Sequence, residues 1–169
     1  MKTIPLTPLT KPSSCGGCAL DPLSSGFMRP SLSTSKDRYK VTLLGEALGE
    51  EEAKLGQPFQ GKAGFKLNRL LEWAGLDRSK FDILNSVWCR PPDNKLEGEW
   101  YEAAAVSFCK QTNWASLLSR SNVVVPMGNV ALNGLVGRKG ILSIRGYILD
   151  SNNHPGIHIL PTVHPTFIQ

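Results

Sequence analysis

Apolar residues recur along the chain in short blocks that predict alternating strands and helices. The stretch 39–64 begins as an apolar strand and continues as a long loop rich in Gly, Glu and Pro. Beyond it, apolar residues recur at helical spacing from Ala63 to Ala74, with polar residues between them. This spacing predicts an amphipathic helix, which Gly75 is well placed to end.

The rest of the chain continues the alternation. The further elements expected are a strand at 81–89, a helix at 99–119, a strand at 122–128, a helix at 129–136, a basic loop at 137–146 and a strand at 146–150. Continuously apolar strands separated by helices are typical of a parallel sheet that is covered on both faces. We therefore expect an α/β fold with a mostly parallel sheet flanked by helices.

Composition narrows the class of protein. With 169 residues, of which 41% are hydrophobic, the chain is expected to form one soluble domain with a real core. No apolar run approaches the roughly 20 residues of a membrane span, and no secretion leader is evident, so we expect a cytoplasmic protein with no membrane partner. The net charge of +5 favours a polyanionic partner such as nucleic acid, although many proteins without one carry as much.

The N-terminal segment differs from the rest of the chain. Residues 1–38 are rich in Pro, Ser and Thr and show neither the helical nor the strand period, which predicts an irregular lead-in to a domain at 39–169. Cys15 and Cys18 lie in this lead-in, and Cys89 and Cys109 lie far downstream. This spacing is compatible with an iron–sulfur cluster, with zinc, or with two small buried thiols downstream, and the pattern alone favours none of them.

Few polar residues follow the predicted strands. Glu46 follows the first strand, Asn85 lies within the second, Asn129 follows the third and His164 follows the last. Each has an ordinary structural explanation, as a loop carboxylate, a capping amide or a solvated imidazole. Because parallel strands end on one edge of a sheet, we expect all four to converge there, together with an exposed Phe59 that lies between Pro and Gly in the sequence.

Four groups of residues resemble the motifs of the family-4 uracil-DNA glycosylases. They are GEALGEEE at 45–52, QPFQGKAG at 57–64, NSVWCRPP at 85–92 and VHPT at 163–166. The GEALG form resembles more narrowly a phage DNA-polymerase-related branch of that superfamily. The resemblance implies a three-layer α/β/α sandwich around a sheet of about four to five strands. It also implies a [4Fe–4S] cluster, a metal-binding site formed by Cys15, Cys18, Cys89 and Cys109.

The implied activity is that of a monofunctional DNA glycosylase in base excision repair. Such a hydrolase breaks the N-glycosidic bond of deoxyuridine in DNA, releases uracil and leaves an abasic site. His164 would donate to the uracil anion as it leaves, and Asn85 would pair with O4 and N3–H of uracil, a pattern that cytosine inverts. Phe59 would stack on the base. Glu46 would either place the attacking water or crowd the methyl group of thymine.

The resemblance also implies contacts with uracil-containing DNA. Backbone N–H groups of the turn at 45–49, including Gly45 and Ala47, would complete the base pocket. Phe167 or Ile168, in the final HPTFI segment, would act as a wedge in the duplex. The candidates for phosphate contacts, for each of which a solvated charge is an equally good interpretation, are Lys62, Arg138, Lys139 and Arg145.

Three departures from the resembled family leave alternatives open. Leu48 and Thr166 stand where Pro and Ser are usual, and Ala47 stands where the most active glycosylases carry an acidic residue. A second hypothesis is therefore a catalytically weak uracil- or DNA-binding module attached to the replication machinery, and a third is a cluster-bearing redox protein. We expect a monomer, either truncated at its C-terminus or the front part of a longer polypeptide.

Overall fold

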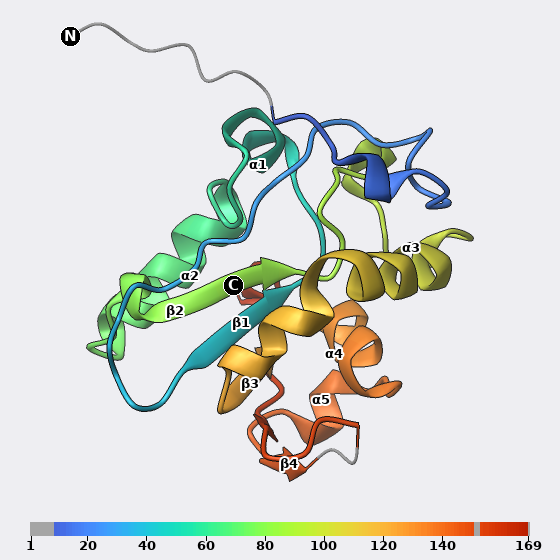
Figure 1. Ribbon diagram of the computed structural model, residues 1–169. Helices are drawn as coiled ribbons and strands as arrows, with labels where there is room; N and C mark the ends of the chain where they lie inside the picture. The colour runs from blue at the N-terminus through green and yellow to red at the C-terminus, as the bar shows by residue number, and fades with distance from the viewer. Residues whose placement is uncertain (1–8, 151–152, 169) are drawn as a thin grey trace, which may run out of the picture.

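A five-stranded sheet forms the centre of the molecule (Figure 1). The computed structural model describes residues 9–150 and 153–168. The strands are β1 (Val41–Gly45), β2 (Phe81–Asn85), β3 (Val123–Pro126), β4 (Leu149–Asp150) and β5 (His158–Ile159), in the order β2-β1-β3-β5-β4. All neighbouring strands are parallel except β4, which runs antiparallel to β5. The predicted α/β class with a mostly parallel sheet is confirmed.

Helices cover both faces of the sheet. They are α1 (Glu50–Leu55), α2 (Lys62–Trp73), α3 (Glu102–Cys109), α4 (Asn129–Val136) and α5 (Ile141–Ile144). Leu67 and Leu71 of α2 pack with Leu43 of β1 on one face, whereas Leu44, the next residue of that strand, packs on the other face with a cluster that includes Ala131 of α4. Successive side chains of a strand point to opposite faces, so β1 is buried on both and reads as an unbroken apolar run. The helices seen across the described ranges are all too short or too polar to cross a membrane.

Two of the predicted helices match the structure closely, and one prediction was wrong. The helix expected from Ala63 to Ala74 is α2, and the helix expected at 129–136 is α4. The single helix expected at 99–119 is instead interrupted: α3 ends at Cys109, a π-helical turn spans Lys110–Trp114, and a 3₁₀ segment follows. Trp114 explains the wider turn, because its buried indole N–H donates to the Ser86 carbonyl oxygen at 3.0 Å.

Two predicted loops contain helices. The stretch after the first strand holds α1, whose first turn is three glutamates and whose end is capped by Gly56 in the left-handed conformation. The basic loop at 137–146 contains α5, which forms because Ile141 and Ile144 are buried together against Leu132 of α4. The strand expected at 81–89 ends at Asn85, since the following residues turn toward the N-terminal segment, where Met28 N–H donates to the Trp88 carbonyl.

The N-terminal segment lies against the body of the domain from residue 9 onward, and its first eight residues lie outside the described part. A short 3₁₀ turn, Ser13–Cys15, is its one helical element in the described residues. Isolated bridges join Ser25 to Arg90 and Ser31 to Ile83. These bonds bring the first two cysteines next to the segment that follows β2.

Candidate active site

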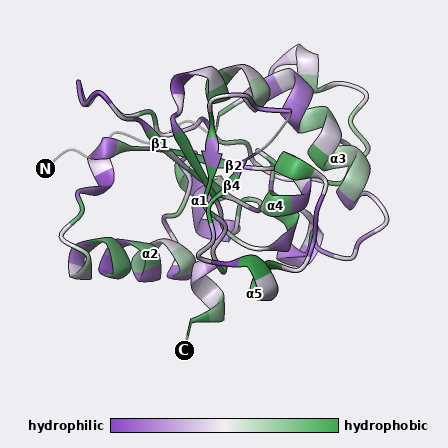
Figure 2. Cartoon of the chain, turned by 90° about the horizontal axis from the view of Figure 1, so that it is seen from below, coloured by the Kyte–Doolittle hydropathy of each residue, from purple (hydrophilic) through white to green (hydrophobic). Residues whose placement is uncertain are grey.

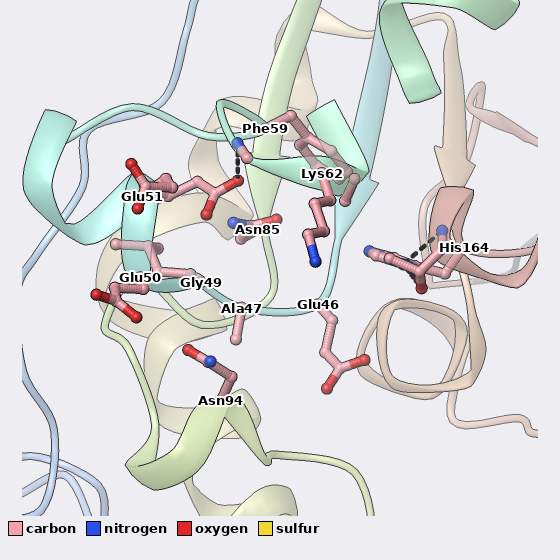
Figure 3. Close-up of a pocket in the computed structure, with 15 residues that line it drawn as sticks. Glu46, Ala47, Gly49, Glu50, Glu51, Phe59, Lys62, Asn85, Asn94 and His164 are labelled. Atoms are coloured by element: carbon pink, nitrogen blue, oxygen red, sulfur yellow. Dashed lines mark hydrogen bonds between the residues drawn. The ribbon is translucent and has the colours of Figure 1, made fainter. Parts of the chain in front are cut away.

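A cleft of about 550 Å³ opens at the carboxyl ends of the parallel strands (Figure 3). This is the edge at which ligands bind in open α/β sheets. Six of the candidate site residues predicted from the sequence line this cleft: Glu46, Ala47, Phe59, Lys62, Asn85 and His164. Segments distant along the chain therefore meet around one opening.

Asn85 forms the buried part of the cleft. It is the last residue of β2, pairs in register with Gly45 of β1, and is 2% exposed. Its amide nitrogen lies 3.5 Å from the Met28 sulfur, a weak acceptor, and its amide oxygen has no hydrogen-bond partner. A buried acceptor without a partner costs free energy unless a ligand or water satisfies it. The Asn85 oxygen is thus available to a donor that enters the cleft.

Phe59 lies beside Asn85, but it is not exposed as the sequence suggested. Its ring is 4% exposed and packs in the core cluster of α2 and β1. Its backbone φ of 55° is unusual for a bulky residue. A Cβ at Gly64 would lie 1.9 Å from the Phe59 carbonyl oxygen, so the close approach of this backbone to α2 requires glycine there. The ring edge that remains forms part of the cleft wall.

Glu52 holds the loop that carries Phe59, and the sequence interpretation missed it. One carboxylate oxygen accepts the backbone N–H groups of Gln60 at 3.0 Å and Gly61 at 2.8 Å. The side chain is buried, with 7% exposed. The run of glutamates after Gly49 is a helix-start pattern that could have revealed α1, but it could not show which glutamate turns inward.

His164 faces Phe59 from the C-terminal segment. The two rings are 5.9 Å apart between centroids and inclined by 33°. Nδ1 of His164 accepts the backbone N–H of Thr166 at 3.4 Å and lies 2.8 Å from the Thr166 hydroxyl oxygen. Burial lowers the pKa of His164, and the Glu52 carboxylate opposes this only in part. The imidazole is therefore neutral near pH 7, with Nε2 as the N–H donor directed to the cleft.

Glu46 directly follows β1 and lies on the opposite side of the opening from Phe59 (Figure 3). Burial raises its pKa to about 7, and the nearby carboxylates of Glu97 and Glu102 act in the same direction. A carboxylate with this pKa is poised to exchange protons near neutral pH. Lys62, in the first turn of α2, points its ammonium group into the same space.

Of the residues expected to contact DNA, only Lys62 lines the cleft itself. Phe167 is 63% exposed and lines a second hollow of about 480 Å³ that shares Glu46 and His164 with the cleft. Lys139 forms an ion pair at 3.5 Å with the buried Glu102, whereas Arg145 donates to the carbonyl of Leu142 in α5. Arg138 and Lys62 are exposed. Gly45 lies beneath the lining residues, where it allows Asn85 and Phe59 to approach.

The four cysteines line one small cavity away from the cleft, with Asp21, Trp88 and Asn113 among its other walls. No disulfide joins them. Burial raises the pKa of Cys15, of Cys89 and, to about 12, of Cys109. Across residues 9–150 and 153–168, no three His, Cys, Asp or Glu side chains are close enough to hold a single metal ion.

Two neighbouring donors suit a sulfur-rich group in this cavity. The Asn113 amide donates to the Cys109 sulfur at 3.2 Å and lies 4.0 Å from the Cys15 sulfur. The indole N–H of Trp88 is buried without a partner. Thiolates and sulfides accept such bonds, which tune the potential of iron–sulfur clusters. The donor set therefore fits a cluster, which spreads its ligands more widely than one ion does.

Comparison with known proteins identifies the class. Residues 32–169 match the family model described as the uracil DNA glycosylase superfamily. Since this match covers most of the chain, the protein belongs to that superfamily.

Three curated relatives are each named type-4 uracil-DNA glycosylase. The one from Thermotoga maritima is 36% identical over 132 residues, which are 76% of this chain and 66% of the relative. The one from Saccharolobus solfataricus is 33% identical over 135 residues, covering 76% and 61%. The one from Pyrobaculum aerophilum is 31% identical over 106 residues, covering 63% and 50%. The chain thus spans between half and about two thirds of the length of these relatives.

Proposed function

We propose that the protein removes uracil from DNA by hydrolysing the N-glycosidic bond of deoxyuridine, as the initiating step of base excision repair. The observation that carries the proposal is the partnerless amide oxygen of Asn85, buried in the cleft that Phe59 and His164 also line. The names of the relatives and membership of the superfamily support the same activity.

Asn85 would read the base edge. Its free amide oxygen matches the N3–H donor of uracil, and its amide nitrogen, now against only the Met28 sulfur, matches the O4 acceptor. Cytosine offers an acceptor at N3 and a donor at position 4, so it would oppose both groups. A site that pairs the polar edge of its substrate discriminates by large factors against an analogue that would leave these buried groups unpaired.

His164 would stabilise the departing base. As the glycosidic bond breaks, its electron pair passes to uracil, and negative charge develops on the base oxygens. A neutral imidazole that presents Nε2–H can donate to such an oxygen without first losing or gaining a proton. The Thr166 N–H on Nδ1 fixes this tautomer, which makes Thr166 a positioning residue for the donor.

Glu46 and Lys62 would act on the sugar side. When ionised, Glu46 can hold a water molecule and accept its proton as the water attacks the sugar carbon that uracil leaves. Lys62, at the start of α2, can bind a backbone phosphate and so place the nucleotide over the cleft. Both groups line the same opening as Asn85.

Cys15, Cys18, Cys89 and Cys109 would hold a [4Fe–4S] cluster. When bound, the cluster would supply electrostatic and structural stabilisation. It would have no redox role, because hydrolytic release of the nucleobase transfers no electrons. Its ligands come from the N-terminal segment, from the stretch after β2 and from α3, so a group held by all four would tie these three segments together. The nearby Asn113 and Trp88 donors support this assignment.

Incubation with a labelled oligonucleotide that contains one uracil, followed by alkali, tests the proposal. We expect strand scission at the uracil, no scission when cytosine or thymine replaces it, and loss of scission in Asn85→Ala. Asn94→Ala is a suitable control for a polar residue on the cleft rim that has no assigned role in base recognition. Tight binding of the uracil strand without scission would instead indicate the non-catalytic binding module.

A further inference from the structure

The outward side of α2 carries a row of cations that ends on a tryptophan. Lys62, Lys66, Arg69 and Trp73 are spaced i, i+4, i+7 and i+11, so they form one stripe along the helix. With a rise of 1.5 Å per residue, the stripe is about 16 Å long. Lys62 lines the cleft at one end of the stripe, and Trp73 is the last residue of α2 at the other.

Trp73 is free of the core. Its side chain is 74% exposed, whereas Leu67 and Leu71 on the opposite side of α2 supply the packing against the sheet. The Arg69 guanidinium lies 5.2 Å from the centre of the indole ring, which keeps a planar cation beside an open aromatic face. Phe65, also on α2, is 64% exposed. Figure 2 shows α2 along one side of the molecule, with the C-terminal segment beside it.

The charges on this stripe remain available. Among residues 9–150 and 153–168, none of Lys62, Lys66 and Arg69 lies within ion-pairing distance of a carboxylate. Lys66 donates to the carbonyl of Ile168, which joins the stripe to the segment that carries His164. A row of unpaired cations interleaved with exposed aromatic rings is the arrangement by which proteins bind single-stranded nucleic acid.

We propose that α2 is a track for single-stranded DNA, on which phosphates next to the target nucleotide face Lys62, Lys66 and Arg69 and an unpaired base stacks on Trp73. This inference rests on the proposed function, since it extends the strand whose uracil enters the cleft. A duplex keeps its bases paired and stacked, so it cannot place one on the indole. The track therefore contributes binding free energy to a single-stranded substrate and not to a duplex.

Trp100 provides a matched comparison. It is equally exposed, at 77%, and packs edge-on against Tyr101 with ring centroids 5.4 Å apart. Its neighbours in sequence are acidic, Glu97, Glu99 and Glu102, so no row of cations leads to it. Trp100 therefore serves as an exposed indole outside the proposed track.

Fluorescence anisotropy with a uracil-free single strand of about 20 nucleotides tests the track. We expect Trp73→Ala to weaken binding about tenfold, Trp73→Phe to retain most of it, and Trp100→Ala to change nothing. Binding to a duplex of the same length should be unaffected by Trp73→Ala. Arg69→Gln should make the negative slope of log affinity against log salt shallower by about 0.7, the value for one phosphate contact on a single strand.

Two results overturn the track: unchanged single-strand affinity in Trp73→Ala, or an equal loss on single strand and duplex. Uracil release from a short oligonucleotide that cannot reach Trp73 separates this inference from the proposed function. Release by the unaltered protein with no effect of Trp73→Ala on long strands rejects only the track. Single-strand binding that depends on Trp73, without any release, rejects only the glycosylase activity.

Discussion

Gly45 and Asn85 are paired across the ends of β1 and β2, and a Cβ at Gly45 would lie 2.3 Å from the amide oxygen of Asn85. The same Cβ would lie 2.5 Å from the Phe59 ring. No real Cβ contact is that short, so the absence of a side chain at Gly45 is what lets the amide and the aromatic ring stand side by side.

Gly45→Ala is therefore expected to impair base recognition more than folding. The added methyl group must displace Asn85 or Phe59. We therefore expect the rate of uracil release to fall by about a hundredfold or more, the cost of losing a well-placed polar contact in the transition state. Single-turnover release and the melting temperature should be measured together. Wild-type release from a folded Gly45→Ala variant would show that these two side chains need no close approach.

The pH dependence of uracil release should follow Glu46. Its pKa of about 7 means that the carboxylate form, which can accept a proton from water, becomes dominant as the pH rises through neutrality. Burial lowers the pKa of His164 from its ordinary value of 6.5, which favours the neutral imidazole as the pH rises through neutrality. We expect kcat/KM to rise between about pH 6 and 8 and Glu46→Gln to lose this rise. An identical pH profile in Glu46→Gln would remove Glu46 from the mechanism.

Glu46 should also make stability depend on pH. Its pKa is raised in the folded protein from 4.5 to about 7, so the folded state binds the proton more tightly than the unfolded chain does. The resulting contribution to the free energy of unfolding is fully present below pH 4.5 and is lost as the pH rises toward about 7. Because Glu46 is only half-buried, the loss should be about 1–3 kcal/mol. Denaturant unfolding of wild type and Glu46→Gln at several pH values measures it. A gap between the two proteins that does not change with pH contradicts the assignment.

Glu52→Ala should release the loop that carries Phe59. The substitution leaves the backbone N–H groups of Gln60 and Gly61 without their charged acceptor, and we expect about 2–3 kcal/mol of destabilisation. Uracil release should fall with it, because the strained backbone of Phe59 is no longer held. Glu51→Ala, on the exposed side of α1, is the control and should stay within about 0.5 kcal/mol of wild type. Equal stability of both variants would argue against this role of Glu52.

The cysteine cavity should hold iron in protein prepared without air. We expect a brown protein with four iron atoms per chain at full occupancy, as the proposed [4Fe–4S] assignment requires. Cys18→Ser should lose the colour and about 2–5 kcal/mol of stability, since the link from the N-terminal segment to Cys89 and Cys109 closes a long loop. A colourless, iron-free protein whose stability is unaffected by Cys18→Ser would show that the thiols are ordinary core residues.

Hydrophobic periodicity predicted the elements that bury apolar side chains. The spacing of Leu67 and Leu71 located α2, and the block at 129–136 located α4, because both helices pack on the sheet through apolar residues. Periodicity missed α1, where the one buried side chain is Glu52 and the stabilising contacts are hydrogen bonds to backbone. The helix break after Cys109 depends on a contact of Trp114 with Ser86, which local sequence cannot reveal.

The candidate site divides in the same way. Strand ends and motifs indicated Glu46, Asn85 and His164, and the structure places all three on one cleft. The burial of Phe59 could not be predicted, since it depends on the glycines at 45 and 64 and on a left-handed backbone. The raised pKa of Glu46 comes first from burial and then from the carboxylates of Glu97 and Glu102, and both causes arise only in the folded chain.

A crystal structure of the protein with free uracil tests the central claim most directly. We predict a uracil ring beside Phe59, with N3–H donating to the Asn85 amide oxygen and a ring oxygen accepting from Nε2 of His164. Uracil bound elsewhere on the protein, or bound in the cleft while the Asn85 oxygen stays without a partner, would contradict it.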